Sequence, residues 1–154
     1  MTTPVSIPAG HKLVATDFDA YENLTAVWTS YAPTWASFGT QPAIGDGSLT
    51  GRSIRVGKFM AFKIVLIPGA STTYGTLTYV FSLPAVPVAN QCCTAWLHDT
   101  STGFRYAGAA VMTSGTAQID GVQFTNGTTG FSGTSPITLA TTDFLIIEGL
   151  CEVA

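Results

Sequence analysis

The sequence predicts an all-β protein, an antiparallel, jelly-roll-like β-sandwich of about eight strands. Apolar or alternating segments recur about every 8–12 residues, a spacing typical of sandwiches and barrels. Hydrophobic residues make up 46% of the 154 residues and charged residues only 10%, so Thr, Ser and Gly supply most of the polar surface. No segment has the length and period of a long helix. We expect one sandwich domain over residues 25–154, preceded by a short extended arm over residues 1–24.

Two long apolar runs between Gly51 and Pro84 predict the centre of this sandwich. Apolar residues alternate in each run, and because successive side chains of a strand point to opposite faces, each run offers one apolar face. These faces consist of Met60, Phe62, Ile64 and Leu66 in the first run and Leu77, Tyr79, Phe81 and Leu83 in the second. Pro68 and Gly69 lie between the runs, so we expect the two runs to form an antiparallel pair.

The arm, residues 1–24, differs from the rest of the chain in composition. Pro4 and Pro8 punctuate an extended stretch, and Thr16 and Asp17 can cap a brief helical turn. The segment is too short to hold its own core, so it docks either on the sandwich or on another molecule, and we expect the second. The docking residues that we expect are Val5, Ile7, His11, Leu13, Phe18 and Tyr21.

The other strands are predicted from alternation and from the residues that separate them. Pro33 lies inside the aromatic segment 28–38, which places that segment at a sheet edge or a bulge. Gly57 follows a strand at residues 48–56 and marks either a bulge or a tight hairpin. Later strands are expected at residues 92–98, 104–112, 117–125 and 143–153, with a glycine-rich, mobile loop at 126–135.

The outward side of the first apolar run is too apolar for water and too charged for a simple core. Phe59, Val65 and Ile67 lie there together with Lys63. A surface with so few charges gives a monomer little protection against association. We therefore expect this side to contact another subunit, with Lys63 opposite Glu148 of the last strand.

The charge distribution leaves two interpretations of one basic segment open. A formal net charge of -3 gives no excess of positive charge that would bind nucleic acid or an anionic membrane, so we expect neither as a partner. Arg52, Arg55, Lys58 and Lys63 lie close together in the sequence. They either guard a strand edge against mispairing or bind an acidic partner.

The sequence contains no recognisable catalytic or metal-binding constellation, so we expect no enzyme, no cofactor and no metal. His98 and Asp99 are neighbours, and adjacent side chains of a strand diverge, so they cannot orient each other as a catalytic pair. Cys92, Cys93 and Cys151 lack the spacing of zinc ligands and are interpreted as small buried hydrophobes.

The aspartates of the strand region lie in turn contexts, which disfavours a glycosidase. Asp46, Asp99, Asp120 and Asp143 each lie beside Gly, Ser or Thr, where aspartate commonly accepts hydrogen bonds from its own backbone. A glycosidase needs two facing carboxylates in a cleft, and no such pair can be assigned.

We do not expect the amino-terminal residues to form a signal peptide or a membrane anchor. The start of the chain lacks the basic region and apolar stretch of a signal peptide. No apolar run reaches the roughly 20 residues that span a bilayer. We expect a protein that is made and kept soluble.

The aromatic residues allow a binding function to be considered, the recognition of a cell-surface glycan. Aromatic rings outside the core could stack on sugars, although burial in a core or an interface is their commoner fate in a β-sandwich. The candidate ligand contacts are Tyr74, Trp96, Asn126 and Phe131.

Several motifs, in this order, resemble a module common in the virions of tailed phages that infect actinobacteria. The matching residues are Tyr31, Pro33 and Trp35; Gly39, Thr40, Pro42, Gly45 and Gly47; Gly51, Arg52, Val56, Gly57 and Lys58; Gly69, Thr73, Tyr74 and Gly75; Phe81, Ser82, Leu83 and Pro84. Residues 140–154 are similar to the closing strand of the module, and residues 7–21 resemble the lead-in of phage tail and fibre proteins.

The resemblance implies a non-enzymatic structural protein that is displayed on the virion surface after assembly in the host cytoplasm. It implies a β-sandwich that usually forms homotrimers. Its partners would be the major capsid protein, for a capsid decoration or head-fibre protein, or tail proteins, for a minor tail protein. The alternative is a tail module that attaches to a host receptor or to cell-wall carbohydrate.

Overall fold

The computed structural model describes residues 27–124 and 130–154. The expectations for the arm, its docking residues, the domain boundary at residue 25 and Asn126 lie outside these residues.

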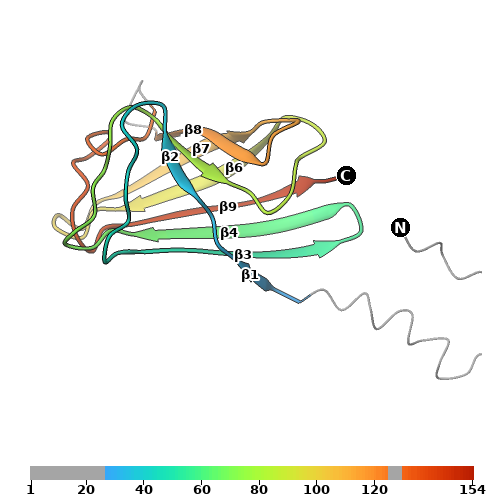
Figure 1. Cartoon of the computed structure of the whole chain (residues 1–154), viewed down its shortest axis with the longest axis horizontal. Helices are drawn as coiled ribbons and strands as arrows, with labels where there is room; N and C mark the ends of the chain where they lie inside the picture. Colours follow the sequence, from blue (N-terminus) through green and yellow to red (C-terminus); the bar gives the residue numbers. More distant parts are fainter. Residues whose placement is uncertain (1–26, 125–129) are drawn as a thin grey trace, which may run out of the picture.

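The described residues form nine strands and no helix (Figure 1). All strand pairs are antiparallel, which confirms an all-β, sandwich-like fold. The strands are β1 Thr29–Tyr31, β2 Trp35–Ser37, β3 Ser48–Val56, β4 Phe59–Ile67, β5 Tyr79–Ser82, β6 Gln91–His98, β7 Arg105–Met112, β8 Gln118–Phe124 and β9 Phe144–Glu152.

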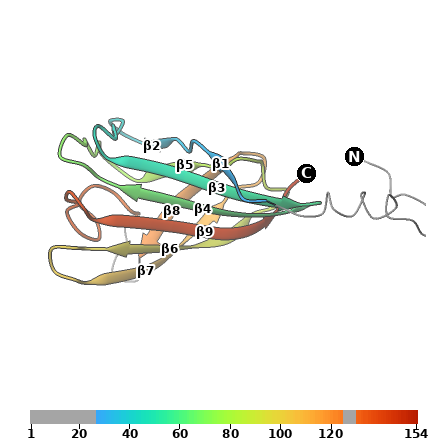
Figure 2. The same ribbon diagram turned by 90° about the horizontal axis from the view of Figure 1, so that it is seen from below.

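The nine strands belong to one hydrogen-bonded sheet in the order β1-β3-β4-β9-β6-β7-β8-β5-β2. The sheet curls, so that the inward faces of its two halves enclose a core (Figure 2). β1 and β2 follow each other in the chain but form the two opposite edges of the sheet. The short segment 32–34 therefore links the two edges across the opening of the curl.

Pro33 explains why the structure has nine strands instead of about eight. The aromatic segment predicted as one strand is two strands of three residues, β1 and β2, on either side of this proline. Proline lacks the backbone N–H that a continuous ladder requires. The prediction of an edge location is confirmed at both edges of the sheet.

β3 and β4 form a two-residue hairpin, as the position of Gly57 suggested. Val56 pairs with Phe59, so only Gly57 and Lys58 lie in the turn. Gly57 has a φ of 58°, a left-handed value that glycine adopts readily and that tight hairpins need. The predicted strand at residues 48–56 is confirmed.

The two long apolar runs do not pair with each other, so this prediction is wrong. β4 pairs with β3 and β9, whereas β5 pairs with β8 and β2. The intervening loop crosses between the two halves of the sheet and is held by an antiparallel bridge between Ala43 and Thr73. Leu77, expected in the core, is exposed and has a φ of 64°, and it precedes β5.

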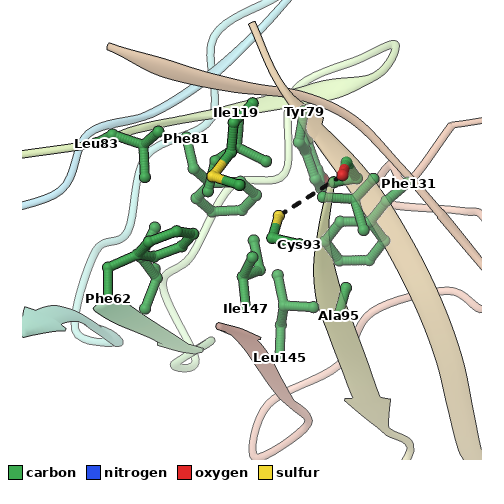
Figure 3. Close-up of a cluster of buried hydrophobic side chains, with 14 of the residues drawn as sticks. Phe62, Tyr79, Phe81, Leu83, Cys93, Ala95, Ile119, Phe131, Leu145 and Ile147 are labelled. Carbon is green, nitrogen blue, oxygen red and sulfur yellow. Dashed lines mark hydrogen bonds between the residues drawn. The ribbon is translucent and has the colours of Figure 1, made fainter. Parts of the chain in front are cut away.

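The core consists of inward side chains of β4 to β9 together with Leu83, Phe131, Leu139 and Val153, which lie outside these strands. Figure 3 shows part of this core. In β4 the alternation that was predicted is confirmed, because Met60, Phe62, Ile64 and Leu66 are all buried. The largest fully buried side chains are Tyr79, Phe62, Phe81, Phe131, Met60, Ile64, Leu66, Leu97, Met112, Ile119, Leu145 and Ile147.

Phe131 belongs to this core, which corrects its assignment as a surface ligand contact. Its side chain is 0% exposed. Its ring lies edge-on to Tyr79, with centroids 5.1 Å apart, and edge-on to Phe124 at 5.4 Å. The Phe131 N–H also donates to the Val122 carbonyl, which fixes the segment against β8.

β8 contains an irregularity that keeps its apolar residues on the core side. The pairing with β7 shifts between Ala109 and Val111, and Gly121 has a φ of 60°. Ile119 and Val122, three residues apart, are therefore both buried. A bulge adds one residue to a strand and so reverses the alternation beyond it.

Candidate interaction face

The outward side chains of β3, β4, β9, β6 and β7 form a continuous surface, here called the outer face. The strand register arranges them in rows that run across the strands. One row contains Arg52, Lys63, Glu148 and Thr94. Lys63 is the direct partner of Glu148, as the sequence suggested. Opposite charges at directly facing positions of an antiparallel pair attract each other.

One end of the outer face carries a cluster of exposed apolar side chains, here called the apolar patch. It consists of Val56, Phe59, Val88, Val111 and Leu150, all of which are exposed. Phe59 is 61% exposed and Leu150 is 60% exposed. Soluble monomers rarely expose large contiguous apolar surfaces, so this end of the outer face is suited to contact another protein surface.

The strand ends hold the members of the apolar patch close together. Val56 and Phe59 face each other at the β3–β4 turn. Gln91 at the start of β6 exchanges hydrogen bonds with the backbone of Glu152, so β6 stays beside β9 at this end. The Val88 N–H donates to the Glu152 carbonyl, which places Val88 next to the end of β9.

All five residues predicted for a subunit interface lie on the outer face. Phe59, Lys63, Ile67 and Glu148 are exposed, and Val65 is half-buried. The sequence reasoning did not find Val111 or Leu150. Their proximity to Phe59 depends on the pairing of distant strands, which alternation within one strand cannot show.

Cys92 also lies on the outer face and corrects the prediction that all three cysteines are buried. It is exposed and pairs with Val111 of the apolar patch, whereas Cys93 and Cys151 are buried. Burial raises the pKa of Cys93 to about 12 and also raises the pKa of Cys151. Because the thiolate is the reactive form, Cys92 is the thiol available for labelling.

The opposite end of the outer face carries an aromatic cluster, defined by Trp96, His98, Phe144 and Arg105. Trp96 stacks on His98 with ring centroids 5.8 Å apart and an interplanar angle of 24°. Phe144 lies edge-on to His98 at 4.9 Å. The Arg105 guanidinium lies 5.7 Å from the centroid of the Trp96 ring. Figure 2 shows that the β6–β7 turn and the start of β9 share this end, while the β3–β4 turn lies at the other.

The structure separates the aromatic residues proposed as ligand contacts. Tyr74 is half-buried on the core side, with its ring 6.5 Å from that of Trp35, and its carbonyl accepts a hydrogen bond from the Tyr79 hydroxyl. Trp96 lies on the outer face. The two residues therefore cannot form one site, and the neighbours of Trp96 are His98, Phe144 and Arg105 instead.

Two aspartates organise the loops beside the aromatic cluster. Asp99 accepts hydrogen bonds from the backbone and hydroxyl groups of Ser101 and Thr102, so its predicted role within its own turn is confirmed. Asp143 is 1% exposed and accepts from the Ala140 N–H and from both the N–H and the hydroxyl of Thr100. It therefore joins the β6–β7 turn to the segment before β9.

We expect Asp99 to remain ionised down to about pH 2. The hydroxyls of Ser101 and Thr102 donate to its carboxylate and hold its pKa at about 2, below its ordinary value. Since the folded pKa lies below the unfolded one, the stabilisation from this group is complete above the unfolded pKa. It is lost as the pH falls through about 2. Carboxyl NMR titration measures the midpoint.

Two hydroxyl deletions test the cause of this pKa shift. Ser101→Ala and Thr102→Val should each raise the Asp99 midpoint, because each removes a donor to the carboxylate. Thr100→Val is the control, since the Thr100 hydroxyl donates to Asp143. A midpoint for the parent near 3.9, the usual value for aspartate, would contradict the assignment.

Neither a metal centre nor a membrane-spanning helix occurs in residues 27–124 and 130–154. No three His, Cys, Asp or Glu side chains of these ranges gather closely enough to hold a metal ion. No helix there is long and apolar enough to cross a bilayer. What the geometry defines is an all-β protein with an apolar patch and an aromatic cluster at opposite ends of one sheet face. No protein-family model, curated protein or solved structure matches the chain.

Proposed function

We propose that this chain is a non-enzymatic structural protein of a tailed bacteriophage virion. In this proposal the protein is displayed on the particle surface as a homotrimer, as a capsid decoration protein, head fibre or minor tail protein. Residues 1–24 anchor it to the major capsid protein or to tail proteins. The ordered motifs between Tyr31 and Pro84 support the virion assignment by resemblance.

The apolar patch is the observation that supports self-association most strongly. Phe59 and Leu150 each leave more than half of their surface in water, and burying them against another copy would remove apolar area from solvent at about 25 cal/mol per Å². The patch lies beside the Lys63 and Glu148 pair. A surface that carries both charge signs next to apolar residues can match a second copy of itself.

A charge placed in the apolar patch should separate the subunits. We expect the parent protein to have the mass of three chains in light scattering after gel filtration, and Leu150→Glu to have the mass of one. Leu77→Glu is the matched control, because Leu77 is 62% exposed, outside the apolar patch, and its variant should remain trimeric. Circular dichroism and melting curves check that both variants are folded.

Labelling of Cys92 gives a second readout of the same interface. Maleimide should react slowly with Cys92 in the trimer and faster in Leu150→Glu, because Cys92 lies next to Val111 of the patch. A parent protein that has the mass of one or two chains at high concentration would overturn the trimer. Equal labelling rates in the parent and in Leu150→Glu would show that the apolar patch is not part of the interface.

The anchoring role is tested by binding to purified virion parts. Full-length protein and a version lacking residues 1–24 are mixed with undecorated heads and with isolated tails. Saturable binding to heads that requires residues 1–24 supports a decoration protein, and such binding to tails alone supports a minor tail protein. Binding to neither, or binding that survives the deletion, contradicts anchoring by these residues.

A second candidate function, attachment to a host glycan, is favoured by the aromatic cluster. Its four residues lie at the other end of the outer face from the apolar patch. The two roles can therefore coexist in one molecule.

A further inference from the structure

The aromatic cluster at the β6–β7 end of the outer face is not used by the proposed structural role. The register sets Phe144, His98 and Arg105 in one row across β9, β6 and β7, and Trp96 comes next on the same side of β6. We propose that this cluster binds a neutral glycan through Trp96, His98, Phe144 and Arg105. The inference deepens the second candidate function, on which it rests, and depends neither on the virion role nor on trimer formation.

The three rings form a compact aromatic surface, stacked, tilted or edge-on to one another, and a sugar ring can pack against its exposed parts. Trp96, His98 and Phe144 are all half-buried, and Trp96 and Phe144 lie with their ring centroids 5.4 Å apart. Mutual contacts fix the orientation of each ring. Ligand sites combine such aromatic surfaces with a few convergent polar groups, and the C–H faces of a sugar complement aromatic rings.

His98 contributes a polar group whose hydrogen-bonding capacity is unused within the described part of the chain. Its Nδ1 is buried and has no hydrogen-bond partner there. A buried, unpartnered ring nitrogen costs free energy. A sugar hydroxyl that reaches this nitrogen would supply the missing partner, and the contacts with Trp96 and Phe144 hold the His98 ring in place for it.

Arg105 supplies hydrogen-bond donors beside these three rings. Its side chain is exposed, and the guanidinium lies over the Trp96 ring. A stacked guanidinium still presents N–H groups at its rim, in a planar arrangement suited to two neighbouring acceptor oxygens. Adjacent hydroxyls of a sugar ring offer such a pair.

The neighbouring loops favour a neutral ligand over an anionic one. Asp99 and Asp143 flank the cluster in sequence and outnumber Arg105, so the local charge is not positive. Their carboxylates hold the two loops in place. The loops expose the hydroxyls of Thr100 and Thr142, which lie 2.9 Å apart and can each make a further hydrogen bond.

An array of neutral oligosaccharides built from glucose, galactose, mannose or arabinose tests the proposal, with oligogalacturonate as the anionic comparison. We expect saturable binding of at least one neutral member, weaker binding of oligogalacturonate, and little change between low and high salt. Binding of no member, or binding of oligogalacturonate alone, would overturn the proposal.

The chain offers a matched control for the site residues, since Arg52 of the outer face forms a second such pair with Trp28, its guanidinium carbon 5.8 Å from the centroid of the ring. Arg105→Gln and Trp96→Ala should each weaken glycan binding about tenfold, the effect of losing roughly 1.4 kcal/mol. Arg52→Gln and Trp28→Ala should leave it unchanged. Equal losses from both pairs would contradict a specific site.

Two variants, Arg105→Gln and Leu150→Glu, distinguish loss of the glycan site from misfolding and from loss of the trimer. Arg105 is exposed, so its substitution does not disturb the core. The loss of glycan affinity in Arg105→Gln can therefore be measured even if Trp96→Ala does not fold. Leu150→Glu should retain glycan binding, since Leu150 lies at the other end of the outer face. Loss of binding in Leu150→Glu would show that the glycan site requires trimer formation, which contradicts a site complete within one subunit.

Discussion

Phe62→Ala is expected to lower the free energy of unfolding by about 4 kcal/mol, within the range for deleting a buried phenylalanine side chain. Phe62 is 1% exposed and lies in the core on β4. β4 is hydrogen-bonded to both β3 and β9, so the backbone around the cavity has little freedom to collapse into it. Denaturant unfolding of the folded variant measures the change.

Phe38→Ala is the matched control for this loss. Phe38 is also a phenylalanine but is 67% exposed, so its removal should change stability by about 0.5 kcal/mol or less. If both variants lost the same stability, the core as described would be wrong. An insoluble Phe62→Ala can be replaced by Phe62→Leu, for which a smaller loss of the same sign is expected.

Asp143→Ala is expected to destabilise the protein by about 3 kcal/mol, the order of one or two hydrogen bonds to a charged acceptor. Asp143 is 1% exposed and accepts three hydrogen bonds from Thr100 and Ala140. Alanine leaves these donors without a partner and separates the β6–β7 turn from the start of β9. Denaturant unfolding and amide exchange at Thr100 measure the two effects.

Asp143→Asn separates the loss of charge from the loss of hydrogen bonding. The amide retains one acceptor oxygen for Thr100, but its NH₂ group would face the Ala140 N–H if that oxygen stays in place. We expect a loss smaller than that of alanine. A fully stable Asp143→Ala would show that water replaces the carboxylate at no cost.

Strand positions followed from the sequence wherever alternation was regular. In β9, Leu145, Ile147 and Cys151 are buried while Glu148 and Glu152 are exposed, as alternation predicts. Turn residues marked the ends of β3 correctly because Gly57 takes a backbone conformation that suits glycine.

Strand pairing could not be predicted in the same way. β4 and β5 have equally apolar faces. Such faces can be buried in one core whether or not the two strands are hydrogen-bonded neighbours. The bulge near Gly121 and the burial of Phe131 depend on contacts with β7 and β5. No local pattern carries that information.

The candidate sites were predicted one strand at a time. Lys63 and Phe59 were assigned to the outer side of their strand, and Trp96 was selected as an exposed aromatic. The clusters around them required the register, which brings Arg105 beside His98 and Val111 beside Cys92. The signal for Cys92 was present, since one of two adjacent strand residues must point outward.

The position of β9 has a consequence for biosynthesis. β9 lies between β4 and β6 in the sheet, although it follows both of them in the chain. Until the ribosome has made β9, the β3–β4 and β6–β7 hairpins each present an unpaired edge toward the gap, and such edges are prone to wrong pairing. The sheet can close only after β9 has been made and has paired with both hairpins, so sheet closure waits for the synthesis of this interior strand.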